Sequence, residues 1–207
     1  TRPTTGTHKS ITVQKQSNFW PSLQAFFKSQ QFQLIVGILL IFTSLMLLIA
    51  YISFLFNGAN DMSIIEQGTT RKAMREGVTN ALGLPGAVIA SWLVDSMFGI
   101  LVVLPIILLG VYALKILFNF EWKGWKIFFC SLFCMLWGAI ALGFIQQLIP
   151  TSSFFRWGGA FGEHIAILAI SYIQALGLGL TLLVTLIIFA IVADKHFVDQ
   201  RQKNQEV

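Results

Sequence analysis

"LGLPGAVIASWLVDSMFGILVVLPIILLG" (Leu82 to Gly110) is the stretch that decides the fold of this chain. It is too apolar to lie in water. At about 1.5 Å per helical residue it is also longer than one crossing of a hydrocarbon core about 30 Å thick. Asp95, Gly83, Pro85 and Gly86 fall in its first part, whereas the part after Gly99 carries no charge. We therefore divide the run at Gly99, which predicts a short apolar helix over residues 86–97 and a transmembrane helix over residues 99–118.

Composition sets the class of the whole chain. Its 207 residues are 56% hydrophobic and 11% charged, with a mean hydropathy of +0.74, whereas soluble domains are about a quarter charged. Lipid offers no partners to backbone polar groups, so a membrane span is a helix or part of a closed barrel. The apolar runs are continuous rather than alternating, which excludes the barrel. The predicted fold is therefore all-α and polytopic.

Three further runs are long enough to span a bilayer, namely residues 34–56, 127–149 and 174–192. A second short apolar helix is expected over residues 159–173, and residues 57–80 are expected to form a polar loop. Apolar stretches of about 10–14 residues are typical of interfacial or re-entrant segments. The prediction is thus four transmembrane helices plus two short interfacial or re-entrant helices on the outer side, with Pro105 kinking the second span.

The basic residues predict the orientation. Ten Lys and Arg lie in the N-terminal arm, the turn between spans two and three, and the tail, against four in the other loops. Cytoplasmic loops carry the excess of Lys and Arg, so both termini are expected in the cytoplasm. The net charge of +5 is a topology signal, because no cluster is dense enough for a nucleic-acid patch. The expected divisions are a cytoplasmic arm with an interfacial approach helix (1–33), the membrane domain (34–193) and the start of a cytoplasmic linker (194–207).

A weak internal repeat relates the two halves. Each half consists of a span, an outer loop, a glycine-rich short apolar helix and a second span. "LGLPGA" (Leu82 to Ala87) corresponds to "GGAFGE" (Gly158 to Glu163), with Gly86 and Gly162 at matched positions.

This layout resembles the N-terminal membrane domain of the FtsK/SpoIIIE family of bacterial DNA translocases, over about residues 30–193. The positions that carry the resemblance are Gly86, Ala87, Phe98, Gly99, Pro105 and Gly110 in the first motif, and Gly158, Gly159 and Gly162 in the second. One departure concerns an acidic residue that the family often has near the first motif. Ser91 stands at that position and Asp95 comes four residues later, which leaves a special role for the acid unsupported.

The resemblance implies a non-catalytic membrane anchor and assembly domain. Such a domain holds the translocase at the division septum of the cell inner membrane, for cell division and chromosome segregation. A hexameric motor that binds ATP, Mg²⁺ and DNA would lie downstream, and other division proteins would be partners. This chain has no G-x-x-x-x-G-K-[ST] sequence, so we expect neither enzymatic activity nor a cofactor in it. The alternative is a small transporter or channel subunit, because transporters often build sites from broken helices.

The polar residues within apolar runs have two possible interpretations each. Asp95 is either a proton or ion site or, as we favour, an interfacial carboxylate. Glu163 and His164 are adjacent, so on a helix they point about 100° apart and make a poor acid–base or metal pair. Glu163 in a first helical turn instead complements the helix dipole.

Small residues predict helix packing rather than a cofactor site. Cys130, Cys134, Gly138 and Ala141 are spaced along one face of span three, which is typical of a packing seam. The two cysteines are expected to be reduced, because helical i, i+4 positions are about 5–6 Å apart at Cβ and a disulfide needs about 3.8 Å. The positions assigned structural roles are Gly83, Gly86, Ala87, Gly99, Pro105, Gly110, Gly138, Gly158, Gly159 and Gly162.

Overall fold

The computed structural model describes residues 29–68, 70–118, 124–149 and 152–193, and every regular element in these ranges is a helix. The elements are α2 (Gln30–Glu66), α3 (Arg71–Gly77), α4 (Gly83–Ser91), η1 (Trp92–Phe98), η2 (Gly99–Val102), α5 (Val103–Phe118), α6 (Gly124–Leu148) and α7 (Gly159–Ala193). Four helical runs are long and apolar enough to cross a membrane: Gln30–Glu66, Gly83–Phe118, Gly124–Leu148 and Gly159–Ala193. The predicted all-α polytopic membrane fold is confirmed.

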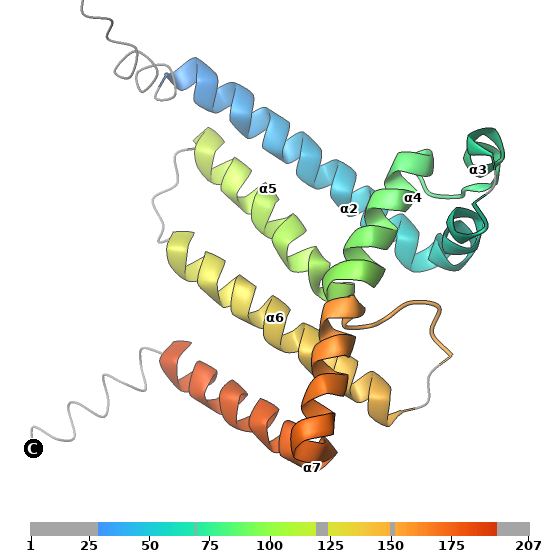
Figure 1. The fold of residues 1–207 in the computed structure, drawn as a ribbon. Helices are drawn as coiled ribbons and strands as arrows, with labels where there is room; N and C mark the ends of the chain where they lie inside the picture. Colours follow the sequence, from blue (N-terminus) through green and yellow to red (C-terminus); the bar gives the residue numbers. More distant parts are fainter. Residues whose placement is uncertain (1–28, 69, 119–123, 150–151, 194–207) are drawn as a thin grey trace, which may run out of the picture.

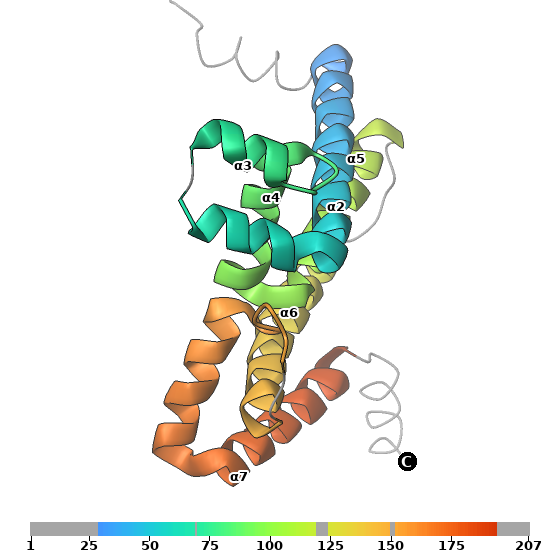
Figure 2. The ribbon, with the colours of Figure 1, turned by 90° about the vertical axis from the view of Figure 1, so that its right-hand side faces the viewer.

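The long helices form a single row. α2, α5, α6 and the C-terminal half of α7 lie side by side in that order, while α4, η1 and the N-terminal half of α7 run across them (Figure 1). The start of α2, the end of α5, the start of α6 and the end of α7 lie on one side of the molecule. We call the opposite side, which carries α3, α4 and residues 152–158, the loop side. Figure 2 shows the row from its edge, with α3, α4 and the first half of α7 standing out from it.

Both crossing helices end at a sharp break in the backbone. In the first, Met97 (φ −105°, ψ −105°) and Gly99 (φ 68°) leave the helical conformation, and α5 then runs in the direction of the row. In the second, the break within α7 is at Gln174 (φ 61°, ψ 167°). Gly83 and Gly159, the first residues of the two crossing helices, share a φ of +65°. In both halves of the chain, the crossing helix therefore begins at a glycine with positive φ and ends at a break in the backbone.

Two expectations about the first half are wrong. Residues 57–66 continue α2 and residues 71–77 form α3, so residues 57–80 are not simply a polar loop. The helix continues because Asp61 is buried in it and Met62 packs against the core, so tertiary contacts outweigh the local polarity. The chain changes direction at Met97–Gly99 rather than at Pro105, which lies in the first turn of α5, where a missing N–H is tolerated. The arm 1–28, the turn 119–123 and the tail 194–207 lie outside the described residues.

The buried core lies between α2 and the four elements of the second run, α4, η1, η2 and α5. Ala50, Tyr51 and Phe54 of α2 pack against Ala90, Val94, Val102 and Ile106. Polar side chains add hydrogen bonds across this contact, since Ser44 Oγ donates to the carbonyl of Ile106 at 2.8 Å and the Tyr51 hydroxyl donates to the carbonyl of Ile100 at 2.9 Å.

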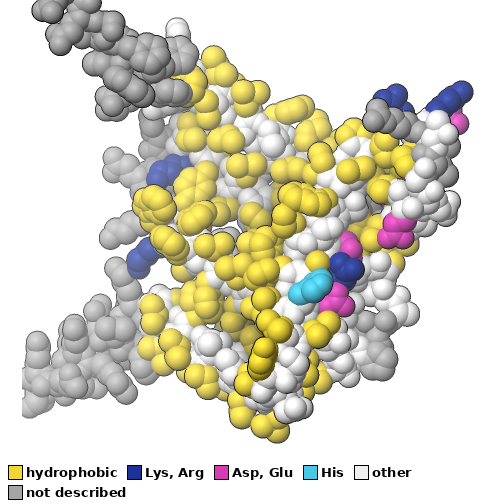
Figure 3. Space-filling view, in the orientation of Figure 1, with side chains coloured by type: hydrophobic (Ala, Val, Ile, Leu, Met, Phe, Trp, Pro, Cys, Tyr) yellow, Lys and Arg dark blue, Asp and Glu magenta, His cyan; other side chains and the backbone are white. Residues whose placement is uncertain are grey.

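The second pair, α6 and α7, is joined in the same way. Trp137 Nε1 donates to Thr185 Oγ1 at 3.0 Å, and the Phe133 and Phe189 rings are stacked. Elsewhere the long helices expose apolar side chains, which cover much of the face in Figure 3, as expected of a surface in contact with lipid.

Candidate functional site

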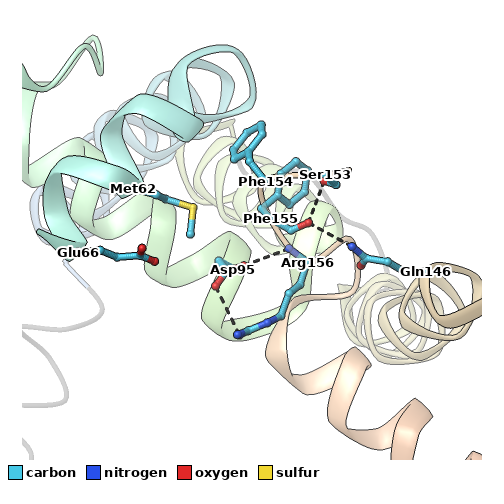
Figure 4. Close-up of a pocket in the computed structure, with 8 residues that line it drawn as sticks. All are labelled: Met62, Glu66, Asp95, Gln146, Ser153, Phe154, Phe155 and Arg156. Carbon is cyan, nitrogen blue, oxygen red and sulfur yellow. Dashed lines mark hydrogen bonds and ion pairs between the residues drawn. The ribbon is translucent and has the colours of Figure 1, made fainter. Parts of the chain in front are cut away.

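The main polar cluster of the loop side is built around Arg156. Its Nη1 lies 3.5 Å from Asp95 Oδ2, and its Nε lies 2.8 Å from Glu163 Oε2. The backbone N–H of Arg156 also donates to Asp95 Oδ1 at 3.1 Å (Figure 4). One arginine therefore joins η1 to the first turns of α7, and its single positive charge is shared between the two carboxylates that interrupt the apolar runs.

The loop that carries Arg156 is held on both flanks by hydrogen bonds. Trp157 N–H donates to Gln146 Oε1 of α6 at 2.8 Å, and the Trp157 carbonyl accepts from Ile100 N–H at 3.0 Å. Within the loop, Ser153 Oγ donates to the carbonyl of Phe155 at 2.9 Å. These bonds satisfy backbone groups that would otherwise be unpaired near lipid.

Beside this loop lies a pocket of about 230 Å³. It is lined by Met62, Glu66, Asp95, Gln146, Ser153, Phe154, Phe155 and Arg156, which come from the end of α2, η1, α6 and the loop (Figure 4). Arg156 and Asp95 already pair with each other within it, so the pocket wall is itself part of the contact between the two halves of the chain.

A second polar cluster lies where α2 meets the segment before α4, and the sequence reading missed it. Asp61 is fully buried, and its Oδ1 accepts from the N–H of Thr79 at 2.7 Å and from Thr79 Oγ1 at 2.9 Å. Asp61 Oδ2 has no hydrogen-bond partner among the residues that the structure describes. The buried Asn80 donates from Nδ2 to the carbonyl of Ala50 at 3.2 Å and accepts from the N–H of Leu82. These bonds fix the connection into the first crossing helix.

His164 and Glu163 point to different surroundings, as adjacent helical residues must. Glu163 faces Arg156, whereas His164 is exposed and its Nδ1 donates to the carbonyl of Ala160 at 2.6 Å. Among the described residues, no group of three or more His, Cys, Asp or Glu is arranged to hold a metal ion.

Glycines allow backbones to approach closely at the first break and at the start of α7. A Cβ on Gly99 would collide with the carbonyl of Trp157, and a Cβ on Gly159 would collide with the carbonyl of Met97. Gly158 and Gly162 lie in the same way against Ala139 of α6. The break at Met97–Gly99, the start of α7 and α6 therefore meet through main-chain atoms.

The remaining positions with assigned structural roles differ in their surroundings. A Cβ on Gly86 would lie 2.5 Å from Asn80 Oδ1, and one on Gly110 would lie 2.9 Å from Ser44 Oγ. Gly83 has open space around it, so its positive φ is its only special feature. Ala87 is fully buried, and Pro105 is exposed.

The predicted packing seam on span three is wrong at its two cysteine positions. Cys130 and Cys134 are exposed, and α6 buries Met135, Ala139 and Gly143 instead. Small residues occur on more than one face of this helix, and spacing alone does not show which face meets α7. Gly138 does contact a neighbour, because a Cβ there would collide with Leu101 of η2.

Comparison with known families agrees with this architecture. The family model of the 4TM region of DNA translocase FtsK/SpoIIIE matches residues 29–202, which include all four long helical runs. No curated protein and no solved structure matches the chain.

Proposed function

Since the chain belongs to the family of the 4TM region of the DNA translocases FtsK and SpoIIIE, we propose that it is the membrane anchor and assembly domain of an FtsK-like translocase. The anchor holds the translocase at the division septum of the cell inner membrane during cell division and chromosome segregation. Its termini lie in the cytoplasm, where a downstream hexameric motor binds ATP, Mg²⁺ and DNA, and other division proteins contact the assembly.

The family match over the four spans is the observation that carries this proposal. The polar cluster supports a non-catalytic role, because Asp95 and Glu163 are engaged by the same arginine and tie helices together. In a transporter, by contrast, ionisable groups near the bilayer interior usually mark the path of an ion or proton. The start of α2 and the end of α7 lie on the same side of the row, which supports placing both termini on one side of the membrane, and the excess of Lys and Arg in the termini favours the cytoplasmic side.

The test is complementation by the full-length, fluorescently tagged protein. Deletion of residues 1–193 should abolish septal localisation, because it removes every long apolar run of this chain. Asp95→Asn and Glu163→Gln keep the side-chain shapes and should leave localisation and division largely intact. The anchor proposal fails if the deleted protein still localises normally. It also fails if stably expressed Asp95→Asn alone blocks division, which would favour the transporter alternative.

A further inference from the structure

A second pocket, of about 620 Å³, lies between α3 and the start of α4, away from the Arg156 cluster. It is lined by Arg75, Gly83, Leu84, Pro85 and Val88. One wall thus carries a guanidinium, and the remaining lining residues offer no charged side chain.

Arg75 lines this pocket, and Lys72, three residues earlier in α3, lies on the same face of that helix. Lys72 and Arg75 are both exposed, and within the described part of the chain neither forms an ion pair with a carboxylate. α3 (RKAMREG) contains three basic residues and one acidic residue, Glu76. α3 lies at the upper right of Figure 1, and basic side chains project at the same place in Figure 3. An anion approaching this helix therefore meets an unbalanced positive charge.

The apolar side of the pocket continues into a surface that suits lipid. Along α4 and η1, Val88 and Ile89 are each 44% exposed and Trp92 is 52% exposed. In a chain that spans the bilayer, apolar side chains left uncovered at this level contact lipid, and Trp is typical of the membrane–water boundary. The pocket lies where this apolar face meets the basic helix.

We propose that this pocket binds an anionic phospholipid, with its phosphate at Arg75 and Lys72 and the upper part of an acyl chain along Leu84, Pro85 and Val88. The occupant needs an anionic head and an apolar tail because the two walls differ in this way. The volume lies within the range of about 300–1,000 Å³ usual for small-molecule sites. The proposal is independent of the anchoring function, since it requires only that the chain lies in a membrane.

The test uses the purified full chain in nanodiscs that contain a trace of photoactivatable phosphatidylglycerol, with the crosslinked peptides identified by mass spectrometry. A parallel sample contains photoactivatable phosphatidylcholine with the same acyl chains. We expect phosphatidylglycerol to label peptides from residues 71–92 severalfold more than phosphatidylcholine does. Each basic residue near a membrane surface contributes about 1 kcal/mol towards anionic lipid, a factor of about five, so K72Q/R75Q should reduce that labelling severalfold, to the level seen with phosphatidylcholine.

Matched variants separate charge from folding. Arg75→Lys keeps the charge and should retain most of the labelling, whereas Lys126→Gln removes an exposed lysine from the other side of the row and should leave it unchanged. Soluble glycerol phosphate should compete poorly, because it lacks the tail. Equal labelling by the two lipids in the unmodified chain overturns the proposal whether or not the double variant folds. So does full labelling of a folded K72Q/R75Q, or efficient competition by glycerol phosphate.

Discussion

Arg156 and Asp95 are joined twice, once through the backbone N–H of Arg156 and once through its guanidinium. The two contacts differ in kind. The backbone hydrogen bond needs only an acceptor at position 95 and survives the loss of the arginine side chain. The ion pair involves a side chain that is 42% exposed, so solvent weakens it.

This double contact predicts which of the two carboxylate variants loses more stability. Asp95→Ala should destabilise the protein more than Glu163→Ala, because it leaves the N–H of Arg156 without its acceptor, at a cost of about 1–3 kcal/mol. Glu163→Ala removes only a partly exposed ion pair, which contributes about 0–1 kcal/mol. Unfolding in mixed micelles with increasing denaturing detergent measures both. In an Arg156→Gln background the effect of Glu163→Ala should vanish, while that of Asp95→Ala should persist. Equal losses for both residues in that background would contradict the assignment.

Comparing Gly99 with Gly83 separates the cost of a strained backbone conformation from the cost of a steric collision. Both have a positive φ, but only Gly99 lies against another backbone, at the carbonyl of Trp157. Gly83→Ala should therefore cost about 1–2 kcal/mol, the penalty of a left-handed conformation. Gly99→Ala should cost about 3 kcal/mol or more, because steric overlap adds to that penalty. Thermal unfolding in detergent compares the two, and equal shifts would show that the break does not pack against the 152–158 loop.

Replacement of Gln174 by glycine should stabilise the protein. Its φ of 61° with ψ of 167° belongs to a region that is essentially limited to glycine, and the corresponding break in the first half has Gly99. We expect Gln174→Gly to raise the free energy of unfolding by about 1 kcal/mol, whereas Gln174→Ala gives no such gain. Ser171→Gly, three residues earlier in the regular helix, should instead lower stability by about 0.5–1 kcal/mol. If Gln174→Gly destabilises as much as Ser171→Gly, α7 is continuous at this point.

How much of the fold could be predicted depends on how local its causes are. The all-α class and the number of spans follow from the length and hydropathy of continuous runs, which are local properties. A break at Gly99 could also be anticipated, since glycine is the residue that adopts a positive φ without penalty. Gln174 gives no such signal through its residue type, although the expected division between residues 159–173 and 174–192 falls at the same place.

The contacts of the polar site could not be predicted from spacing. Asp95 was singled out, but its partner lies 61 residues away in a loop. The one available signal was that Arg156 is the sole basic residue between Pro150 and Trp157. The polarity of residues 57–80 predicts a loop around Asp61, and nothing in a polar stretch shows that Thr79 folds back onto it. The face of α6 that meets α7 was also ambiguous, since small residues occur on several faces.

Asp61 should tolerate amidation better than truncation. Its Oδ1 accepts two hydrogen bonds from Thr79, while the buried Oδ2 has no partner in the described part of the chain. Asp61→Asn keeps an acceptor oxygen and carries no charge, so we expect a change within about 1 kcal/mol. Asp61→Ala leaves both donors of Thr79 without an acceptor and should cost about 1–3 kcal/mol or more. Detergent unfolding of the two variants checks this, with Ser63→Ala on the exposed side of α2 as a control. The interpretation fails if Asn is as harmful as Ala.

The orientation can be checked by cysteine labelling. After replacement of Cys130 and Cys134 by alanine, single cysteines are introduced at Gln67 and at Ser152, both exposed on the loop side. An impermeant maleimide added to intact spheroplasts should label both, whereas a cysteine at Gln200 should react only after lysis. Labelling of residue 200 in intact spheroplasts, with none at residues 67 and 152, would reverse the orientation.

The pairing of the helices also has a consequence for biogenesis. α2 packs with α4 and α5, and α6 packs with α7, so the strongest contacts connect segments that leave the ribosome one after another. Contacts between neighbours in sequence form early, because little chain entropy is lost in closing them. The first pair can therefore assemble in the bilayer while the second is still being synthesised. The N–H of Ile100 then lacks its acceptor until the carbonyl of Trp157 arrives, which makes this main-chain bond a late, closing step of insertion.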